Sequence, residues 1–140
     1  MNRLLLISTL LLAGVTPAIV PPFHVVVNEE NPLSSLSHDE LSDLFLKKNS
    51  TWSDGSLVLP VDQRETSHVR ERFTREVHHK STAGVRAYWQ QRIFSGRDIP
   101  PPEKDGDAEV IAFVRKHPNA IGYVSAAASS SGIKVLAVRQ

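Results

Sequence analysis

The residues with the clearest chemical potential follow a short apolar run in the first half of the chain. Val58–Val61 has the composition of a strand, a polar turn follows it, and an amphipathic helix is predicted to begin after Ser67. A helix start directs free backbone N–H groups and the positive end of the helix dipole at one point, where an anion is stabilised. The candidate ligand-binding residues are Arg64, Thr66, Ser67, His68, Val69 and Arg70.

The arginines at this junction also have a structural interpretation. A cation in the first turn of a helix opposes the dipole by about 0.3–1 kcal/mol, so it needs an anion or a carboxylate beside it. Glu65 and Glu71 are near in sequence and could neutralise the site internally. Arg70 falls at the edge of the apolar stripe predicted for the helix, where an arginine often packs its stem on the core and pairs with a carboxylate. The residues alone leave both interpretations open.

The histidines and serines do not form a catalytic or metal-binding pattern. His78 and His79 are adjacent, so their side chains diverge by about 100° on a helix, and the other histidines are scattered. Ser67 and His68 are neighbours that do not face each other on a helix, and the sequence holds no G-x-S-x-G elbow or glycine-rich nucleotide loop. We therefore expect a protein that is not an enzyme and has no metal or other cofactor.

The first 18 residues have the composition of a secretory signal peptide. Arg3 supplies a positive charge, an apolar stretch from Leu4 to Ala13 follows, and Thr16–Ala18 offers small residues for cleavage. The apolar stretch is shorter than the about 20 residues that span a bilayer. We therefore expect a signal peptide at residues 1–18, one domain at residues 19–140, export to the periplasm, and no membrane attachment after cleavage.

Charge and cysteine content exclude several classes of protein. The chain of 140 residues has 16 Lys and Arg against 15 Asp and Glu, and it has no cysteine. Removing residues 1–18 takes away one arginine, so the charge becomes balanced and no basic field remains to attract nucleic acid. The lack of cysteine excludes disulfides, thiolate metal sites and a lipid-modified cysteine. An ordinary apolar core must therefore hold the domain together.

Strand-like and helix-like segments alternate along the chain after residue 22. Apolar runs predict strands at Phe23–Asn28, Leu57–Val61, Ala120–Val124 and, at a sheet edge, Ile133–Val138. Helices are predicted to begin after the capping residues Ser37, Ser67, Ser81 or Thr82, and Asp107. Gly122 indicates a close approach of another element or a bend. Together these segments predict an α/β domain with a mixed or mainly parallel sheet and helices on both faces.

An ordered set of short motifs gives the chain a resemblance to a known family. The motifs are Asn31–Pro32, Leu41–Lys47, Trp52–Gly55, Leu59–Val61, Ser67 with Arg70 and Phe73, Tyr88–Trp89 with Phe94–Gly96, and Ala120–Val124. Together they resemble the phosphate-binding periplasmic proteins of ABC transporters, and most of all the short stand-alone members of that type II solute-binding superfamily. The resemblance implies a periplasmic α/β domain equivalent to about one lobe of a two-lobed binding protein.

The resemblance also carries over a ligand site. In the full-length family, a loop with Arg, Asp and a Ser-Gly-Thr run starts a helix and grips phosphate, which implies that Arg64 is the arginine and Ser67 the helix-start hydroxyl. This chain departs from the pattern, because Glu65 or Thr66 replaces the Asp and His68–Val69 replaces Gly-Thr. The predicted function is thus weak binding of phosphate or a similar oxyanion, in connection with phosphate uptake.

A single lobe leaves the predicted ligand exposed on one side. A second protein or a homodimer mate would supply the missing wall. The alternative is a periplasmic interaction or homodimerisation module that keeps the fold without a ligand.

Overall fold

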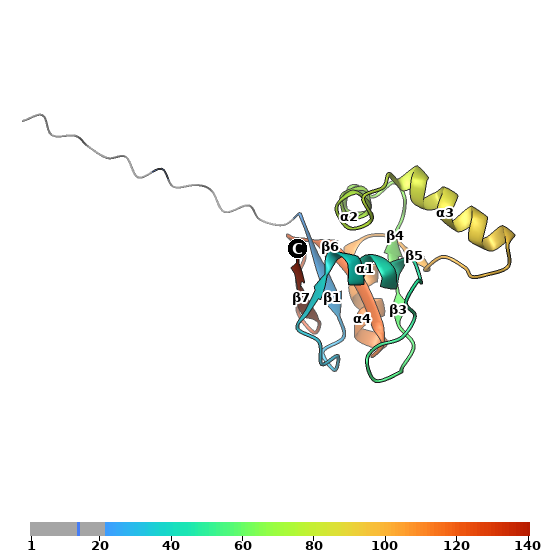
Figure 1. Cartoon of the computed structure of the whole chain (residues 1–140). Helices are drawn as coiled ribbons and strands as arrows, with labels where there is room; N and C mark the ends of the chain where they lie inside the picture. Colours follow the sequence, from blue (N-terminus) through green and yellow to red (C-terminus); the bar gives the residue numbers. More distant parts are fainter. Residues whose placement is uncertain (1–13, 15–21) are drawn as a thin grey trace, which may run out of the picture.

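The computed structural model describes residue 14 and residues 22–140, so the predicted signal peptide lies, apart from Gly14, outside the described residues. The elements are β1 (Phe23–Val27), β2 (Ser35–Ser37), α1 (His38–Phe45), β3 (Leu59–Pro60), β4 (Asp62–Gln63), α2 (His68–His78), α3 (Thr82–Phe94), β5 (Glu103–Lys104), α4 (Asp107–Lys116), β6 (Ala120–Ser125) and β7 (Lys134–Arg139). Figure 1 shows their arrangement. No helix within the described part of the chain is long and apolar enough to cross a bilayer.

The main sheet contains both parallel and antiparallel strand pairs. It is therefore a mixed sheet, which is one of the two forms that the sequence predicted. Its strand order is β2-β7-β1-β6-β3. The central strand β1 pairs antiparallel with both β6 and β7, whereas β3 pairs parallel with β6 and β2 parallel with β7. The apolar run Phe23–Val27 suits this central place because both faces of the strand are covered.

The strand predicted at Ile133–Val138 forms as β7, but its predicted position at the edge of the sheet is wrong. β7 lies between β1 and the short strand β2. Ser35–Ser37 pairs with Ala137–Arg139 immediately before α1 begins. Such a short, serine-rich segment carries no strand signal of its own, because its pairing depends on a partner about 100 residues away in sequence.

The predicted strand Leu57–Val61 is shorter in the structure and is followed by a change of sheet. Only Leu59–Pro60 pairs with β6. After Val61 the chain leaves the main sheet, and Asp62–Gln63 pairs with Glu103–Lys104 in a separate sheet of two strands. The turn that leads to α2 is therefore held by this small sheet.

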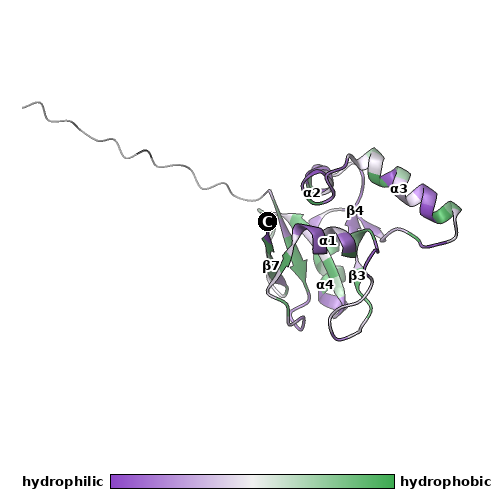
Figure 2. Ribbon diagram, viewed as in Figure 1, coloured by the Kyte–Doolittle hydropathy of each residue, from purple (hydrophilic) through white to green (hydrophobic). Residues whose placement is uncertain are grey.

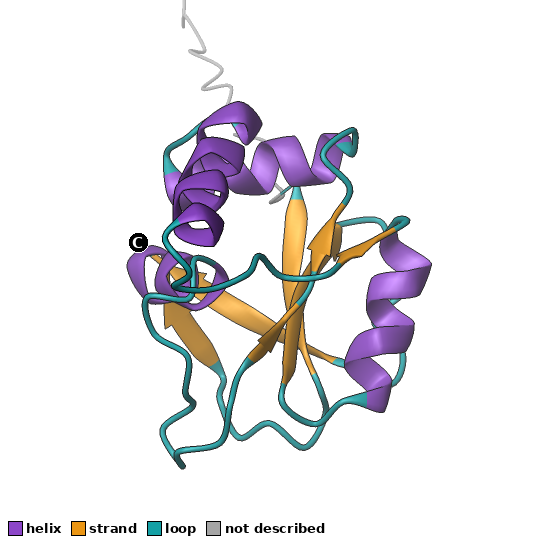
Figure 3. Cartoon of the chain, turned by 90° about the vertical axis from the view of Figure 1, so that its right-hand side faces the viewer, coloured by secondary structure: helices purple, strands orange, loops and turns teal. Residues whose placement is uncertain are grey.

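Helices cover both faces of the main sheet, as predicted. In Figure 3 the strands run between helices on two sides, and in Figure 2 they are mainly hydrophobic. On the face covered by α1 and α2, the core includes Leu41, Leu44, Phe45, Phe73 and Val77. On the face covered by α4, it includes Val61, Val110, Val114 and Val124. The capping serines Ser37, Ser67 and Ser81 each accept a backbone N–H bond, as predicted.

Helix α3 projects from the rest of the domain in Figure 1. It packs against the end of α1 mainly through Val85 and Trp89, which contact Leu46. The C-terminal end of the helix leaves Ile93 and Phe94 exposed, and Phe94 retains 96% of its accessible surface. Among the described residues, none covers this apolar end of α3.

Gly122 lies where α4 crosses the sheet. A Cβ atom at this position would lie 2.7 Å from Val110 Cγ1 and 2.9 Å from Val61 Cγ1. Side-chain atoms do not approach so closely without displacing one another. The sequence expectation of a close approach at Gly122 is therefore confirmed.

Candidate functional site

The predicted anion site is the junction between β4 and α2, near which β5 also lies in Figure 1. The turn is closed by the N–H of Arg64, which donates to Lys104 O over 3.2 Å, and by the N–H of Ser67, which donates to Arg64 O over 2.9 Å. Ser67 is the N-cap of α2, and its hydroxyl accepts from the N–H of Arg70. The strand-turn-helix geometry expected from the sequence is present.

The predicted site residues differ in their exposure. Arg64, Thr66 and His68 are exposed, Ser67 and Val69 are partly buried, and Arg70 is buried. In the described structure, no acceptor bonds the backbone N–H groups of His68 and Val69, which belong to the first turn of α2. Two backbone donors at the helix start are therefore unpaired within the described structure, and the side chains around them do not all face the same way.

Arg70 points into the domain. Its side chain is 5% exposed, and Nη1 donates to the backbone oxygen of Gln63 over 2.7 Å and to Glu103 Oε1 over 2.6 Å. Its Nε lies 3.6 Å from Asp62 Oδ1 and is buried without a hydrogen-bond partner in the described structure. These contacts are those expected of a structural arginine that holds β4, β5 and α2 together.

Asp62 and Tyr123 complete the buried surroundings of this arginine. The Tyr123 hydroxyl donates to Asp62 Oδ1 and accepts from the N–H of Gln63. Burial raises the pKa of Asp62 and outweighs the opposing effects of Arg70 and the tyrosine hydroxyl. Burial and the neighbouring carboxylate also raise the pKa of Tyr123 well above its usual value.

Gln63 joins the helix start to the first turn of α4. Ser67 Oγ donates to Gln63 Oε1 over 2.8 Å, and Gln63 Nε2 donates to Asp107 Oδ1 over 2.9 Å. The hydroxyl proton of Ser67 is thus directed at the protein and away from solvent. The sequence carries no signal for Gln63, because its partners come from distant elements.

The prediction that Asp107 caps α4 is wrong. Gly106, with φ 98°, is the N-cap, and Asp107 is the first helical residue. The Asp107 carboxylate accepts from the N–H of Ser125 over 3.0 Å and from the Ser125 hydroxyl, in addition to Gln63. Because these partners occupy it, the carboxylate does not cap its own helix, and the hydrogen bonds keep its pKa low against the opposing effect of burial.

The exposed charges at the junction are paired within the protein. Arg64 forms a two-point ion pair with Asp105, with Nη2 donating to Oδ2 over 3.0 Å. Glu65 accepts two bonds from Arg86 Nε and one from its Nη2. An exposed ion pair of this kind is worth about 0–1 kcal/mol, so a ligand can exchange with it.

The histidines do not gather into a metal site. No group of three or more His, Asp or Glu side chains in the described part of the chain is arranged to hold a metal ion. His78 instead bonds Ser42, with Nδ1 lying 2.8 Å from Oγ.

His78 is expected to make folding stability depend on pH. Burial, with smaller effects of cations that include Arg70 and Lys48, lowers its pKa to about 4. A histidine in an unfolded chain titrates near pH 6.5, so the unfolded state binds more protons between these two values. Stability is therefore lost as the pH falls through this window. We expect His78 to account for a loss of about 1–2 kcal/mol between about pH 7 and pH 5.

Urea denaturation of the parent and of His78→Gln at several pH values measures this contribution. The parent should lose more stability than His78→Gln as the pH falls. His79→Asn is the control, because His79 is exposed and adopts a left-handed conformation that asparagine tolerates. Equal pH slopes in the parent and His78→Gln would contradict the assignment.

Neither a protein-family model nor a curated protein matches the sequence.

Solved structures do match the fold. One is a protein from Clostridium perfringens assigned as a phosphate ABC transporter substrate-binding protein, with bound phosphate (TM-score 0.67, 18% identity, 84% of this chain and 44% of that one). A second is an ABC-type phosphate transport receptor from Vibrio cholerae, with a TM-score of 0.66 and 15% identity over 84% of this chain and 46% of that one. A third is PstS from Borrelia burgdorferi, with a TM-score of 0.67 and 12% identity over 85% of this chain and 47% of that one.

The chain spans less than half the length of these solved relatives. The resemblance expected from the sequence is therefore confirmed at the level of the fold. The domain has the α/β architecture of about one half of a phosphate-type substrate-binding protein.

Proposed function

We propose that this chain is an exported solute-binding-like module that binds phosphate or a similar oxyanion weakly at the start of α2. The observation that carries the proposal is the start of α2, where no acceptor in the described structure bonds the N–H groups of His68 and Val69 and where the exposed Arg64 belongs to the turn that leads into the helix. The fold supports it, since a matched protein of this architecture was solved with bound phosphate. Thr66 adds an exposed hydroxyl at the same turn.

The affinity of such a site is limited by its small number of donors. A hydrogen bond to a charged group contributes about 1.5–3 kcal/mol, and a millimolar dissociation constant corresponds to about 4 kcal/mol. Two backbone donors and one arginine reach this value after ordering costs. Ser67 and Arg70 do not add to it, because the hydroxyl proton of Ser67 is bonded to Gln63 and Arg70 is buried.

Asp105 is the internal competitor of the ligand in this proposal. Its carboxylate occupies the guanidinium of Arg64 and places a negative charge near the helix start. An incoming anion must displace Asp105 from Arg64. Removing this carboxylate should therefore strengthen anion binding, whereas removing the arginine should weaken it.

Titration calorimetry with inorganic phosphate tests whether an anion displaces Asp105 from Arg64. We expect Asp105→Asn to bind phosphate about threefold to tenfold more tightly than the parent, and Arg64→Ala to bind at least about tenfold more weakly. Arg72→Ala is the matched control, because Arg72 is an exposed arginine on α2 that pairs with Glu76. An unchanged affinity in both Arg64→Ala and Asp105→Asn would exclude this site.

The apolar end of α3 favours a second candidate function, that of an interaction module. Ile93, Phe94 and Ile99 are all more than half exposed. Contact with a second copy of the chain would remove this apolar surface from water, at about 25 cal/mol per Å². The same contact is one way to provide the wall that a single lobe lacks.

Sedimentation of the parent and of Phe94→Ser over a range of concentrations tests this candidate. Self-association through the end of α3 predicts a parent whose mass rises with concentration and a Phe94→Ser variant that stays monomeric. Leu57→Ser, another exposed apolar residue, should leave association unchanged. A monomeric parent at all concentrations would remove the homodimer form of the proposal.

We also propose that residues 1–18 direct export to the periplasm and are then removed. A partner that supplies the second wall would connect the module to phosphate uptake. Mass spectrometry of the protein recovered from the periplasm would locate the cleavage site.

A further inference from the structure

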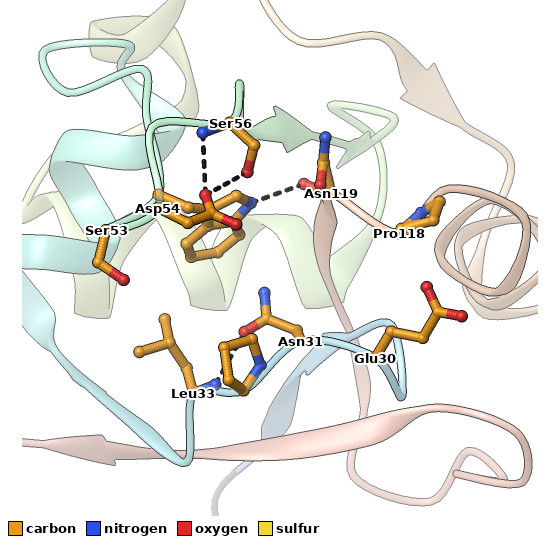
Figure 4. Close-up of a pocket in the computed structure, with 10 residues that line it drawn as sticks. Glu30, Asn31, Leu33, Ser53, Asp54, Ser56, Pro118 and Asn119 are labelled. Carbon is orange, nitrogen blue, oxygen red and sulfur yellow. Dashed lines mark hydrogen bonds between the residues drawn. The ribbon is translucent and has the colours of Figure 1, made fainter.

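A small cavity lies at the end of the main sheet opposite the β4–α2 junction. Since β3 and β6 are parallel and β1 is antiparallel to β6, the loop after β1 meets the loops that precede β3 and β6. These loops enclose about 220 Å³. Figure 4 shows the cavity between Glu30 and Asn31 of the first loop, Asp54 of the second and Pro118 of the third.

Asn31 is a largely buried residue whose side-chain amide nitrogen is directed into this cavity. Its exposed fraction is only 7%. The N–H of Leu33 donates to Asn31 Oδ1 over 2.9 Å, which fixes the orientation of the amide and turns Nδ2 toward the space seen in Figure 4. Among the described residues, no acceptor bonds this Nδ2. A ligand with a carbonyl or carboxylate oxygen would satisfy the donor.

Trp52 gives the cavity a rigid apolar wall. Its indole Nε1 donates to Asn119 O over 3.1 Å, so the ring is held against the loop before β6. The N–H of Gly55 donates to Trp52 O over 2.9 Å and keeps the turn that follows it tight. The face of a tryptophan ring attracts both apolar groups and organic cations.

Asp54 and Glu30 make the cavity electronegative. Asp54 Oδ1 accepts from both the N–H and the hydroxyl of Ser56, which lowers the pKa of the carboxyl and leaves Oδ2 free of protein donors in the described structure. Glu30 is exposed and lines the cavity. The ammonium group of Lys134, which does not line the cavity, donates to Asn31 O and offsets part of the negative charge of the two carboxylates. The balance favours a ligand with one positive charge.

We propose that this cavity binds a small organic amine of about amino-acid size, whose ammonium group is attracted by the carboxylates of Asp54 and Glu30 and whose carbonyl accepts from Asn31. The apolar part of the ligand lies on the ring of Trp52. The site is independent of the anion site, because its residues come from loops at the other end of the sheet.

An NMR titration of the isotope-labelled chain with L-leucinamide tests the proposal. At about pH 6.5 the α-amine is protonated, and N-acetyl-L-leucinamide is the matched ligand without the charge. We expect saturable shifts of the Trp52 indole N–H and of the Asn31 side-chain amide, with Trp89 unaffected. The acetylated ligand should bind at least about fivefold more weakly.

Variants separate a local contact from general electrostatics. Asp54→Asn keeps an acceptor for Ser56 and should weaken binding by at least about fivefold. Glu29→Gln removes the same charge from an exposed side chain that does not line the cavity, and it should change the affinity less than about twofold. The absence of saturable shifts up to about 20 mM, equal binding of the acetylated ligand, or equal effects of the two variants would each overturn the proposal.

Discussion

Replacing Arg70 with methionine is expected to lower the free energy of unfolding by about 3–5 kcal/mol. The side chain is buried and donates to Gln63 O and Glu103, while its Nε faces Asp62. Methionine fills part of the volume but leaves the backbone oxygen of Gln63 and the buried carboxylate of Asp62 without their cation. The pKa of Asp62, already raised by burial, should rise further in the variant.

Urea denaturation of the Arg70→Met variant and of Arg72→Met measures this effect. Arg72 lies on the same helix, but it is exposed, so its replacement should cost less than about 0.5 kcal/mol. Adding Asp62→Asn to Arg70→Met should restore part of the lost stability, because the uncompensated charge is removed. Equal effects of the two arginine variants would contradict a structural role for Arg70.

Replacing Gly122 with alanine is the second change with a large expected effect, a loss of about 2–3 kcal/mol. The new methyl group would meet Val110 Cγ1 and Val61 Cγ1 at distances shorter than side chains tolerate. Both valines are fully buried between α4 and the sheet, so neither can move aside without disturbing the core. Val61 directly precedes β4, which holds the turn of the candidate anion site, so its displacement would also disturb that turn.

The control for this prediction is the same substitution at Gly84. A Cβ atom there finds its nearest neighbour, Ser81 Oγ, at an ordinary 3.4 Å, and alanine favours a helix over glycine by about 0.5–1 kcal/mol. Gly84→Ala should therefore be neutral or stabilising in the same denaturation assay. A decrease of less than about 0.5 kcal/mol in the free energy of unfolding of Gly122→Ala would contradict close packing of α4 against β6 at this position.

Local signals in the sequence predicted much of the fold. The N-caps Ser37, Ser67 and Ser81 form as expected, and Glu40 completes a capping box with Ser37, because each of these contacts depends on residues within one helical turn. The central strand β1 was recognisable because burial on both faces requires an unbroken apolar run. The start of α2 at the candidate site could be predicted for the same reason, because it depends on the N-cap Ser67 and the residues of the first helical turn.

Features that depend on distant partners could not be predicted. The sequence suggested Glu65 or Glu71 as partners for the arginines, whereas Arg64 pairs with Asp105 and Arg70 with Glu103 and Asp62. Two of these acidic residues lie in or beside β5, a short strand that pairs with β4. Strand β2 and the hydrogen bond from Gln63 to Asp107 could not be predicted either, because their partners are also distant in sequence.

The most direct test of the anion site is an NMR titration of backbone N–H groups with inorganic phosphate, at constant ionic strength maintained with chloride. We expect saturable shifts of the His68 and Val69 N–H groups in the millimolar range, and a lower midpoint in Asp105→Asn. Shifts that are absent up to about 50 mM phosphate, or that sulfate and chloride reproduce without saturation, would contradict a binding site at the start of α2.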